Sequence, residues 1–185
     1  MRLKRDYYMQ SALKIAPSLL GKVLVRKYPD GRIIRYTITE TEAYCGEKDK
    51  ACHSFKGKTP RTRIMYEDGG LVYAFFIYGM YWMLAIEVNS KDKPEAVFIR
   101  SLEGISGPGR VGKILEIDKS FYGEDLTTSQ KIWIEDFPRK EGKIVRGKRV
   151  GVDYAGEYAE KLWRFVLLTK PKVPNKIGKK PLKTL

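Results

Sequence analysis

The uncharged run from Leu71 to Ile86 (LVYAFFIYGMYWMLAI) limits the possible folds of this chain more than any other segment. A helix that spans a membrane needs about 20 apolar residues, and this run is shorter and interrupted by Gly79. Its aromatic residues are spread over the whole run instead of marking its ends, and aromatic and β-branched residues favour strands. We therefore expect two strands that meet at Tyr78 and Gly79, and no membrane span.

The other segments predict a mixed α/β fold. Residues 6–20 predict a short helix or two, interrupted at Pro17, and residues 107–117 predict a glycine-rich loop that opens a helix. Strands are predicted at 22–28, 33–44, 97–102, 131–137, 148–154 and 162–169, with a polar loop at 45–70 and a helical turn at 155–161. The length suits one compact domain, residues 1–185, in which residues 1–9 and 170–185 are peripheral or loosely held.

The charge balance indicates a polyanionic partner. Lys and Arg number 36 against 22 Asp and Glu, which gives a formal net charge of +14. Nucleic acid is the usual partner of so basic a domain. A lysine-rich surface of the thermophilic kind is the alternative, but it normally comes with matching acidic residues. Hydroxyl and cationic side chains suited to phosphate oxygens occur in the TPRTR segment and near residue 110: Thr59, Arg61, Arg63, Arg110 and Lys113.

The content of cysteine and histidine predicts neither a metal site nor a disulfide framework. The chain has two cysteines, Cys45 and Cys52, and one histidine, His53, which together cannot supply four zinc ligands. So few cysteines fit a reducing compartment. The N-terminal residues are charged and lack the apolar segment of a secretory signal. We expect an intracellular protein of the cytoplasm and nucleoid, or of the nucleus in a eukaryote.

The predicted strand at residues 33–44 contains the most informative break in pattern. Side chains on a strand alternate between faces. One face, which starts apolar and ends in two carboxylates, has Ile34, Tyr36, Ile38, Glu40, Glu42 and Tyr44, and the solvated face has Arg35, Thr37, Thr39 and Thr41. Carboxylates on a face directed at the core often mark a functional site. Burial would raise the pKa of such a carboxylate toward the range that a general base or acid needs. Alternatively the strand leaves the core and both glutamates meet water. The residues alone favour neither of these two interpretations over the other.

Two further motifs bear on ligand binding. Large rings at the predicted turn, Tyr78 to Trp82, could stack on a nucleic-acid base or wedge between base steps, although core packing of a long apolar hairpin is the alternative. Residues 107–113 (GPGRVGK) fit the start of a nucleotide-binding P-loop, but the next position is Ile114. A P-loop needs Ser or Thr there to hold Mg²⁺, so we do not expect nucleoside triphosphate binding.

Eight segments in this order resemble the alkyladenine (3-methyladenine) DNA glycosylase family. They are SLLGKVLVR, TETEAYCG, ACHS, TPRTRIM, FIYGMYWML, FIRSLE, GPGRVGKILEIDKSF and RVGVDYAGEYAEKLWRF, and they span about residues 10–168. The resemblance implies a curved antiparallel sheet with a protruding hairpin that enters the DNA minor groove. It implies an enzyme that acts on double-stranded DNA. We expect no cofactor and no metal, and a monomer, because no exposed self-pairing surface is evident in the sequence. The substrates implied are 3-methyladenine, 7-methylguanine, hypoxanthine and ethenoadenine, which are flipped out and hydrolysed from the sugar.

The resemblance also assigns roles by position. Glu42 falls on the general base that activates water, and Arg100 on the arginine that holds this water and the carboxylate. Tyr44 and His53 fall on two rings that sandwich the flipped base, with Phe75 as a third, edge-on ring. At the hairpin, Tyr78 falls on the side chain that fills the hole in the base stack, with Met80 as a second intercalating residue. Glu40 matches no catalytic position, and we assign it a structural or supporting role.

Three departures from the family separate this chain from its relatives. Phe75 stands where tyrosine is typical, and Ala85 stands in the base pocket where an asparagine typically crowds the amino group of guanine. The connection from Leu102 to Gly107 is short. The main alternative function is a basic DNA- or RNA-binding module without catalysis, which would leave Glu42 without a role. A lyase step is not expected, although Lys48 and Lys50 lie near Glu42 in sequence.

Overall fold

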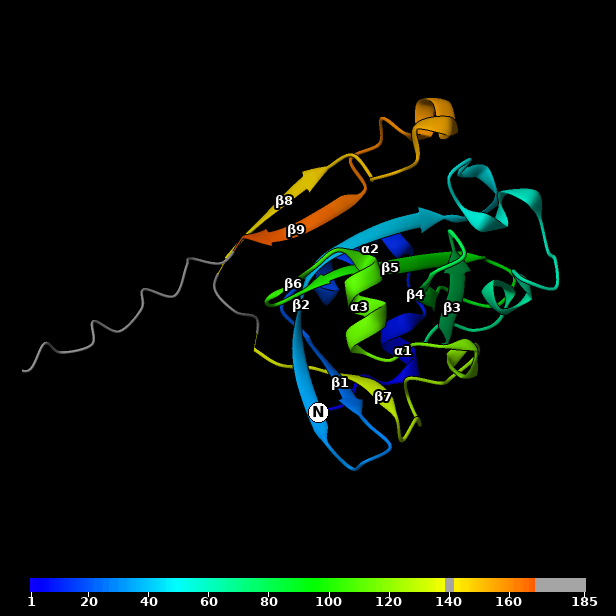
Figure 1. Cartoon of the computed structure of the whole chain (residues 1–185). Helices are drawn as coiled ribbons and strands as arrows, with labels where there is room; N and C mark the ends of the chain where they lie inside the picture. The colour runs from blue at the N-terminus through cyan, green and yellow to red at the C-terminus, as the bar shows by residue number, and fades with distance from the viewer. Residues whose placement is uncertain (139–141, 169–185) are drawn as a thin grey trace, which may run out of the picture.

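A computed structural model describes residues 1–138 and 142–168, which form a mixed α/β fold around an antiparallel sheet (Figure 1). The main path of the sheet has the order β3-β4-β5-β2-β1-β7, with β6 paired to β5 and the β8–β9 pair joined to β2. The strands are β1 (Val23–Lys27), β2 (Ile33–Cys45), β3 (Val72–Ile77), β4 (Tyr81–Val88), β5 (Glu95–Leu102), β6 (Ile105–Ser106), β7 (Ile132–Glu135), β8 (Lys143–Gly147) and β9 (Arg164–Leu168). The expected mixed fold is confirmed.

Few helices accompany the sheet, and no helix among the described residues is long and apolar enough to cross a membrane. The α-helices are α1 (Arg5–Tyr8), α2 (Ala12–Leu19) and α3 (Pro108–Ile114). Short 3-10 turns occupy the connections: η1 (Gly46–Lys48), η2 (His53–Lys56), η3 (Arg63–Tyr66), η4 (Lys119–Phe121) and η5 (Asp153–Tyr158). The segment 45–70, expected as one polar loop, therefore contains three such turns.

Helix α2 covers one face of the sheet and forms the main core with it. Its buried residues Ala12, Ile15, Ala16 and Leu19 recur at the spacing of one helical face. The Thr41 hydroxyl of β2 donates to the Ala16 carbonyl at 2.8 Å, which joins helix and sheet. The expected interruption at Pro17 is wrong, because the helix continues to the fully buried Leu19. The break between helices falls earlier, at residues 9–11.

Two further expectations need correction. Residues 148–154 form no strand: β8 ends at Gly147, and the next residues turn inward toward β2, where the Arg149 side chain is buried. The N-terminal residues are not simply peripheral, since Leu3 and Tyr8 are buried and the Leu3 amide donates to the Ile134 carbonyl at 2.8 Å. The expectation for residues 170–185 lies outside the described residues.

The uncharged run folds as expected, into β3 and β4. Their turn places both Tyr78 (φ 52°) and Gly79 (φ 67°) in the left-handed region, and the Met80 amide donates to the Ile77 carbonyl at 3.2 Å. Turns of this hand suit the twist of a two-stranded hairpin. A ring residue at positive φ is uncommon and costs about 1–3 kcal/mol, which points to a role for the Tyr78 side chain.

Glu87, in β4, is fully buried, and within the described residues neither of its carboxylate oxygens has a hydrogen-bond partner. Burial raises its pKa well above the usual value, so folding favours the protonated acid. In the unfolded chain this acid ionises normally. Its contribution to stability is therefore fully present below about pH 4.5 and is lost as the pH rises toward the folded pKa.

The variant Glu87→Gln cannot ionise and is expected to remove this pH dependence. At pH 8 it should be more stable than the wild type by about 1–3 kcal/mol, because an amide is less costly to bury than an unpaired carboxylate. Urea unfolding of both proteins at pH 5 and pH 8 measures the difference. An equal loss of stability in both proteins between these pH values would contradict the assignment.

Candidate active site

Two irregularities between β2 and β5 decide which side chains face the site. Ile38 pairs with Leu102, Glu40 with Ser101 and Thr41 with Ile99, so Thr39 is an extra residue in β2 and Arg100 is one in β5. Such bulges shift the alternation of faces. The predicted division of faces is therefore wrong. Ile38, Thr41 and Ala43 are buried, with Ile38 and Ala43 in the core around α2, whereas Glu42 and Tyr44 turn toward the opposite side.

Glu42 is completely buried at the centre of a hydrogen-bond network. Its Oε1 accepts from the Val150 amide at 2.8 Å, and its Oε2 accepts from the Tyr44 hydroxyl at 2.9 Å. The Arg100 guanidinium lies 3.4 Å from the carboxylate. Burial raises the pKa of Glu42, although the Arg100 charge and the two hydrogen bonds act against the rise. The alternative in which Glu42 meets bulk water is wrong, and its raised pKa suits a general base.

Glu40 holds Arg100 in place. The Arg100 Nε lies 3.3 Å from the Glu40 carboxylate, which also accepts from the Ser101 hydroxyl at 2.6 Å and from Arg164 at 3.1 Å. Burial acts to raise the pKa of Glu40, but the donors from Ser101 and Arg164 and the Arg100 charge outweigh it and lower the pKa. The two carboxylates thus have opposite pKa shifts. Glu40 stays ionised and orients Arg100 between itself and Glu42.

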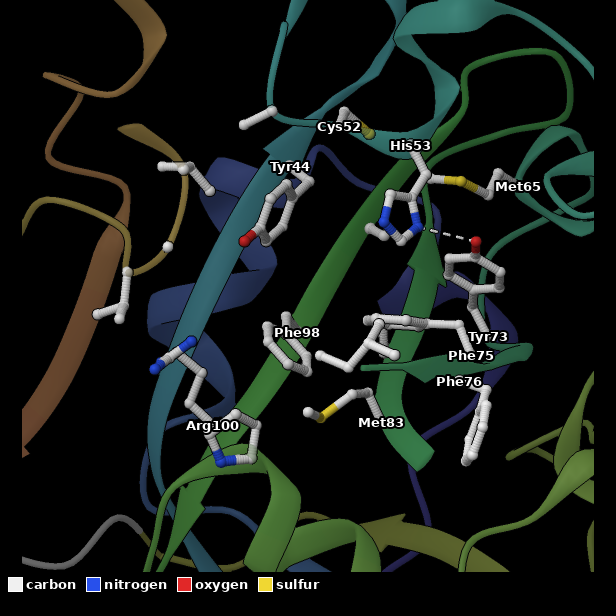
Figure 2. Close-up of a pocket in the computed structure, with 18 of the residues that line it drawn as sticks. Tyr44, Cys52, His53, Met65, Tyr73, Phe75, Phe76, Met83, Phe98 and Arg100 are labelled. Carbon is white, nitrogen blue, oxygen red and sulfur yellow. Dashed lines mark hydrogen bonds between the residues drawn. The ribbon is translucent and has the colours of Figure 1, made fainter. Parts of the chain in front are cut away.

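An aromatic cavity of about 580 Å³ opens beside Glu42. Tyr44 and His53 lie on opposite sides of it, and Phe98 and Phe75 lie below them in the view of Figure 2. Ala85 lines the cavity as well. Glu42 itself does not line it but lies directly behind Tyr44, Arg100 and Val150, which do. The predicted base-binding residues are therefore gathered around one space.

His53 is held as a neutral ring by the cavity wall. Its Nδ1 is 2.9 Å from the Tyr73 hydroxyl (Figure 2), and its ring meets Phe75 edge-on with centroids 5.0 Å apart. Burial, with a smaller effect of the nearby Arg61 charge, lowers the pKa of His53 to about 4. At neutral pH the imidazole is uncharged, so this wall of the cavity does not repel a cation.

Sequence reasoning missed several cavity residues, among them Tyr73, Met83 and Phe98. Each lies two positions from a residue that was predicted, Phe75, Ala85 and Arg100 respectively, so strand alternation would have found them. The cavity-lining segment 150–152 was missed because a strand was predicted there. The Val150 amide leaves no mark in a sequence, since any residue except proline supplies one.

The predicted DNA-contacting residues lie at the surface. Tyr78 is 80% exposed and also lines the cavity, and Met80 is 64% exposed at the same turn. Arg61 reaches the cavity rim, with its guanidinium 5.9 Å from the Phe75 ring. The Thr59 hydroxyl is used within its own loop, where it contacts Thr62 at 2.9 Å. Exposed positions are also taken by Arg63 on η3 and by Arg110 and Lys113 on α3.

Cys45 and Cys52 are both free thiols, and Cys52 lines the cavity. Within residues 1–138 and 142–168, no three side chains of His, Cys, Asp and Glu gather in a way that could hold a metal ion.

Comparison with known proteins shows to which family the chain belongs. The model of the methylpurine-DNA glycosylase family matches residues 6–107 and 103–171. A protein of Natranaerobius thermophilus named "putative 3-methyladenine DNA glycosylase" is 38% identical, covering 92% of this chain and 98% of its own length. Proteins of the same name from Methanocella arvoryzae (40% identical; 94% and 96% covered) and Clostridium novyi (39%; 95% and 99%) are similar. The chain therefore belongs to the methylpurine-DNA glycosylase family of DNA repair enzymes.

Proposed function

We propose that this chain flips alkylated and deaminated purines out of double-stranded DNA and hydrolyses their N-glycosidic bonds, leaving abasic sites. The observation that carries the proposal is Glu42, a fully buried carboxylate directly behind an aromatic cavity. A pure binding module would have no use for it, because a carboxylate close to phosphates weakens binding. The substrates in view are 3-methyladenine, 7-methylguanine, hypoxanthine and ethenoadenine.

The cavity suits a flipped purine by size and by chemistry. Its volume of about 580 Å³ lies within the range of small-molecule sites. A base between Tyr44 and His53 would gain stacking energy, and a positively charged alkylpurine would gain cation–π attraction to the electron-rich rings. The neutral His53 does not oppose that charge. Flipping costs a few kcal/mol, and less for a base that pairs poorly, which itself favours lesions.

The proposed chemistry follows the logic of glycoside hydrolysis. As the purine leaves, the sugar develops oxocarbenium character, and a water activated by Glu42 attacks the sugar carbon. Arg100, which lies 3.4 Å from Glu42 and lines the cavity, would orient this water. Positive charge on an alkylated base makes it a good leaving group, so modest catalysis suffices. No amine takes part, and the expected product is an intact abasic strand.

Release of the free base tests the proposal against the alternative of a binding module. A duplex with one hypoxanthine or ethenoadenine is incubated with the protein, the free base is quantified, and half of the sample is treated with hot alkali. We expect one free base released per lesion duplex. The strand should be cleaved only in the half of the sample that is treated with alkali and should stay intact in the other half. Binding should weaken steeply with salt, as for roughly 5–10 phosphate contacts. Binding without base release from any lesion duplex would establish the module and overturn the proposal.

The exposed ring at the hairpin tip is expected to support base flipping. Replacing Tyr78 by serine should weaken binding to a lesion duplex by about 1–3 kcal/mol, the value of one aromatic side chain stacked on a base. Fluorescence anisotropy with a labelled duplex measures the change. Phe137→Ser, which removes an exposed ring after β7 that does not line the cavity, is the matched control. Equal affinities for Tyr78→Ser and the control would contradict a role of this ring in DNA.

The small side chain of Ala85 is expected to admit guanine derivatives. Ala85 is buried and lines the cavity, so Ala85→Asn would put an amide where the amino group of guanine must fit. We expect release of 7-methylguanine to fall about tenfold relative to 3-methyladenine. Hypoxanthine, which lacks that amino group, serves as the internal control. An unchanged ratio of the two methylated bases would refute this specificity.

A further inference from the structure

We propose that the buried ion pair between Arg149 and Asp49 is a positioning device for Glu42, which it holds through the Val150 amide and the Tyr44 ring. Asp49 lies in the turn after β2, and Arg149 lies in the segment after β8, so the pair joins two distant parts of the chain. The inference rests on the proposed function only for its catalytic consequence. The positional claim can be tested without activity.

The pair is fully buried, and among its side-chain nitrogen and oxygen atoms only the Arg149 Nε has no hydrogen-bond partner within the described residues. Arg149 Nη1 and Nη2 donate to the two Asp49 oxygens at 2.6 and 2.9 Å, and both side chains are 0% exposed. The guanidinium also donates to the carbonyls of Ala43 and Tyr158 at 3.0 and 3.1 Å. The carboxylate also accepts from the amides of Cys45 and Ala51, each at 3.0 Å. The segment that begins at Arg149 is thereby fixed to the end of β2.

Val150 depends on this anchor for its position. Its side chain is 51% exposed, so packing holds it weakly, and Gly151 after it adopts a positive φ of 75°. Yet its amide donates to Glu42 Oε1 at 2.8 Å. Arg149, the preceding residue, supplies the contacts that set where this amide points.

Arg149 also supports the second donor to Glu42. Its guanidinium carbon lies 4.7 Å from the centroid of the Tyr44 ring and 5.0 Å from that of Trp163. The Tyr44 hydroxyl donates to Glu42 Oε2 at 2.9 Å. Arg149 therefore supports two of the donors to Glu42, the Val150 amide and the Tyr44 hydroxyl. A buried ion pair adds little net stability compared with apolar residues of similar size, so its use here fits positioning better than stabilisation.

The charges around Glu42 determine what loss of the anchor would do. From β2, Tyr44 and Glu40 face it; from β5, Arg100 does; and Arg164 of β9 neutralises Glu40. The Val150 amide is a donor that lowers the pKa of Glu42 against the effect of burial. If the segment 149–152 loosens, this donor is lost, and Glu42 becomes harder to ionise. Its titration therefore moves to higher pH.

The test compares Arg149→Lys, which keeps the charge but not the two-pronged contact, with the wild type. Glu160→Gln is the matched control, because it removes the exposed ion pair of the neighbouring Lys148 and leaves Glu42 untouched. The titration of Glu42 is followed by NMR of the ¹³C-labelled carboxyl groups, assigned with Glu42→Gln. We expect a higher midpoint in Arg149→Lys alone. The same midpoint in all three proteins overturns the proposal, whether or not the protein releases bases.

Single-turnover base release supplies the second readout. Arg149→Lys should slow base release on the order of 10²-fold, the effect of a small misplacement of a catalytic group. Its affinity for the lesion duplex should be unchanged. The rate of release should begin to fall, with decreasing pH, at a higher pH than in the wild type. The positioning role is contradicted if the variant has the rate and the pH dependence of the wild type. It is also contradicted if the affinity for the duplex falls by the same factor as the rate. Should circular dichroism show Arg149→Lys to be unfolded, Asp49→Asn decides by the same two readouts, because its amide oxygen still accepts from the backbone.

Discussion

Glu42→Gln is expected to slow base release by about 10²–10⁴-fold, the usual contribution of a general base. The amide keeps the shape of the side chain and can still accept from the Val150 amide, but it cannot take a proton from water. Affinity for a lesion duplex should remain, because Glu42 does not line the cavity. Single-turnover release of hypoxanthine, with duplex affinity measured in parallel, separates the two effects.

The matched control is Glu157→Gln, an exposed glutamate on η5 outside the network of Glu42. It should release the base at the wild-type rate. The pH dependence gives an independent check. Because burial raises the pKa of Glu42, wild-type activity should fall with decreasing pH at a higher pH than an exposed glutamate would give. A Glu42→Gln variant as fast as the wild type would show that the base is another group.

Gly112→Ala is expected to destabilise the fold by about 1–3 kcal/mol or more, the usual cost of overpacking. A Cβ at this position would lie 1.9 Å from the carbonyl oxygen of Trp82 in β4. Helix α3 cannot simply retreat, because Val111 and Leu115 on either side are fully buried. Since Trp82 is near the hairpin turn, the change also displaces the tip that contains Tyr78.

Urea unfolding measures this loss, and the adjacent Lys113→Ala is the control. Lys113 is exposed, so its truncation should change the free energy of unfolding by less than about 0.5 kcal/mol. If Gly112→Ala were as stable as this control, the close packing of α3 on β4 would be wrong. The contact explains Gly112, the third glycine of the GPGRVGK segment, as a packing residue, which fits the absence of the Mg²⁺-binding hydroxyl of a P-loop.

Much of the site could be predicted from the sequence because its residues lie on strands in recognisable segments. Glu42, Tyr44, Phe75, Ala85 and Arg100 come from β2, β3, β4 and β5, and all lie in or directly behind one cavity. The strands themselves followed from aromatic and β-branched runs and from turn residues. Local patterns of this kind survive folding because each strand has one face to bury.

The failures have physical causes that a pattern cannot reveal. Alternation along β2 put Ile38 on the face of Glu42, but the extra residue Thr39 reversed the faces between them. Arg149 was read as part of a strand because it precedes apolar residues. Its side chain is instead buried against Asp49, a hundred positions away in the chain. Bulges and buried ion pairs are set by tertiary contacts, which local sequence patterns do not encode.

The long strand β2 has a consequence for how the enzyme can move. Its first half pairs with β1, and its second half is bonded on both edges, to β5 and β9. Glu42 thus lies on a strand that is hydrogen-bonded along both edges, and we expect the amides around it to exchange with solvent only on global unfolding. In the proposed reaction, any movement that admits a base must therefore come from the hairpin tip with Tyr78 and Met80, while Glu42 and the segment 149–152, which the Arg149–Asp49 pair fixes to the end of β2, stay in place.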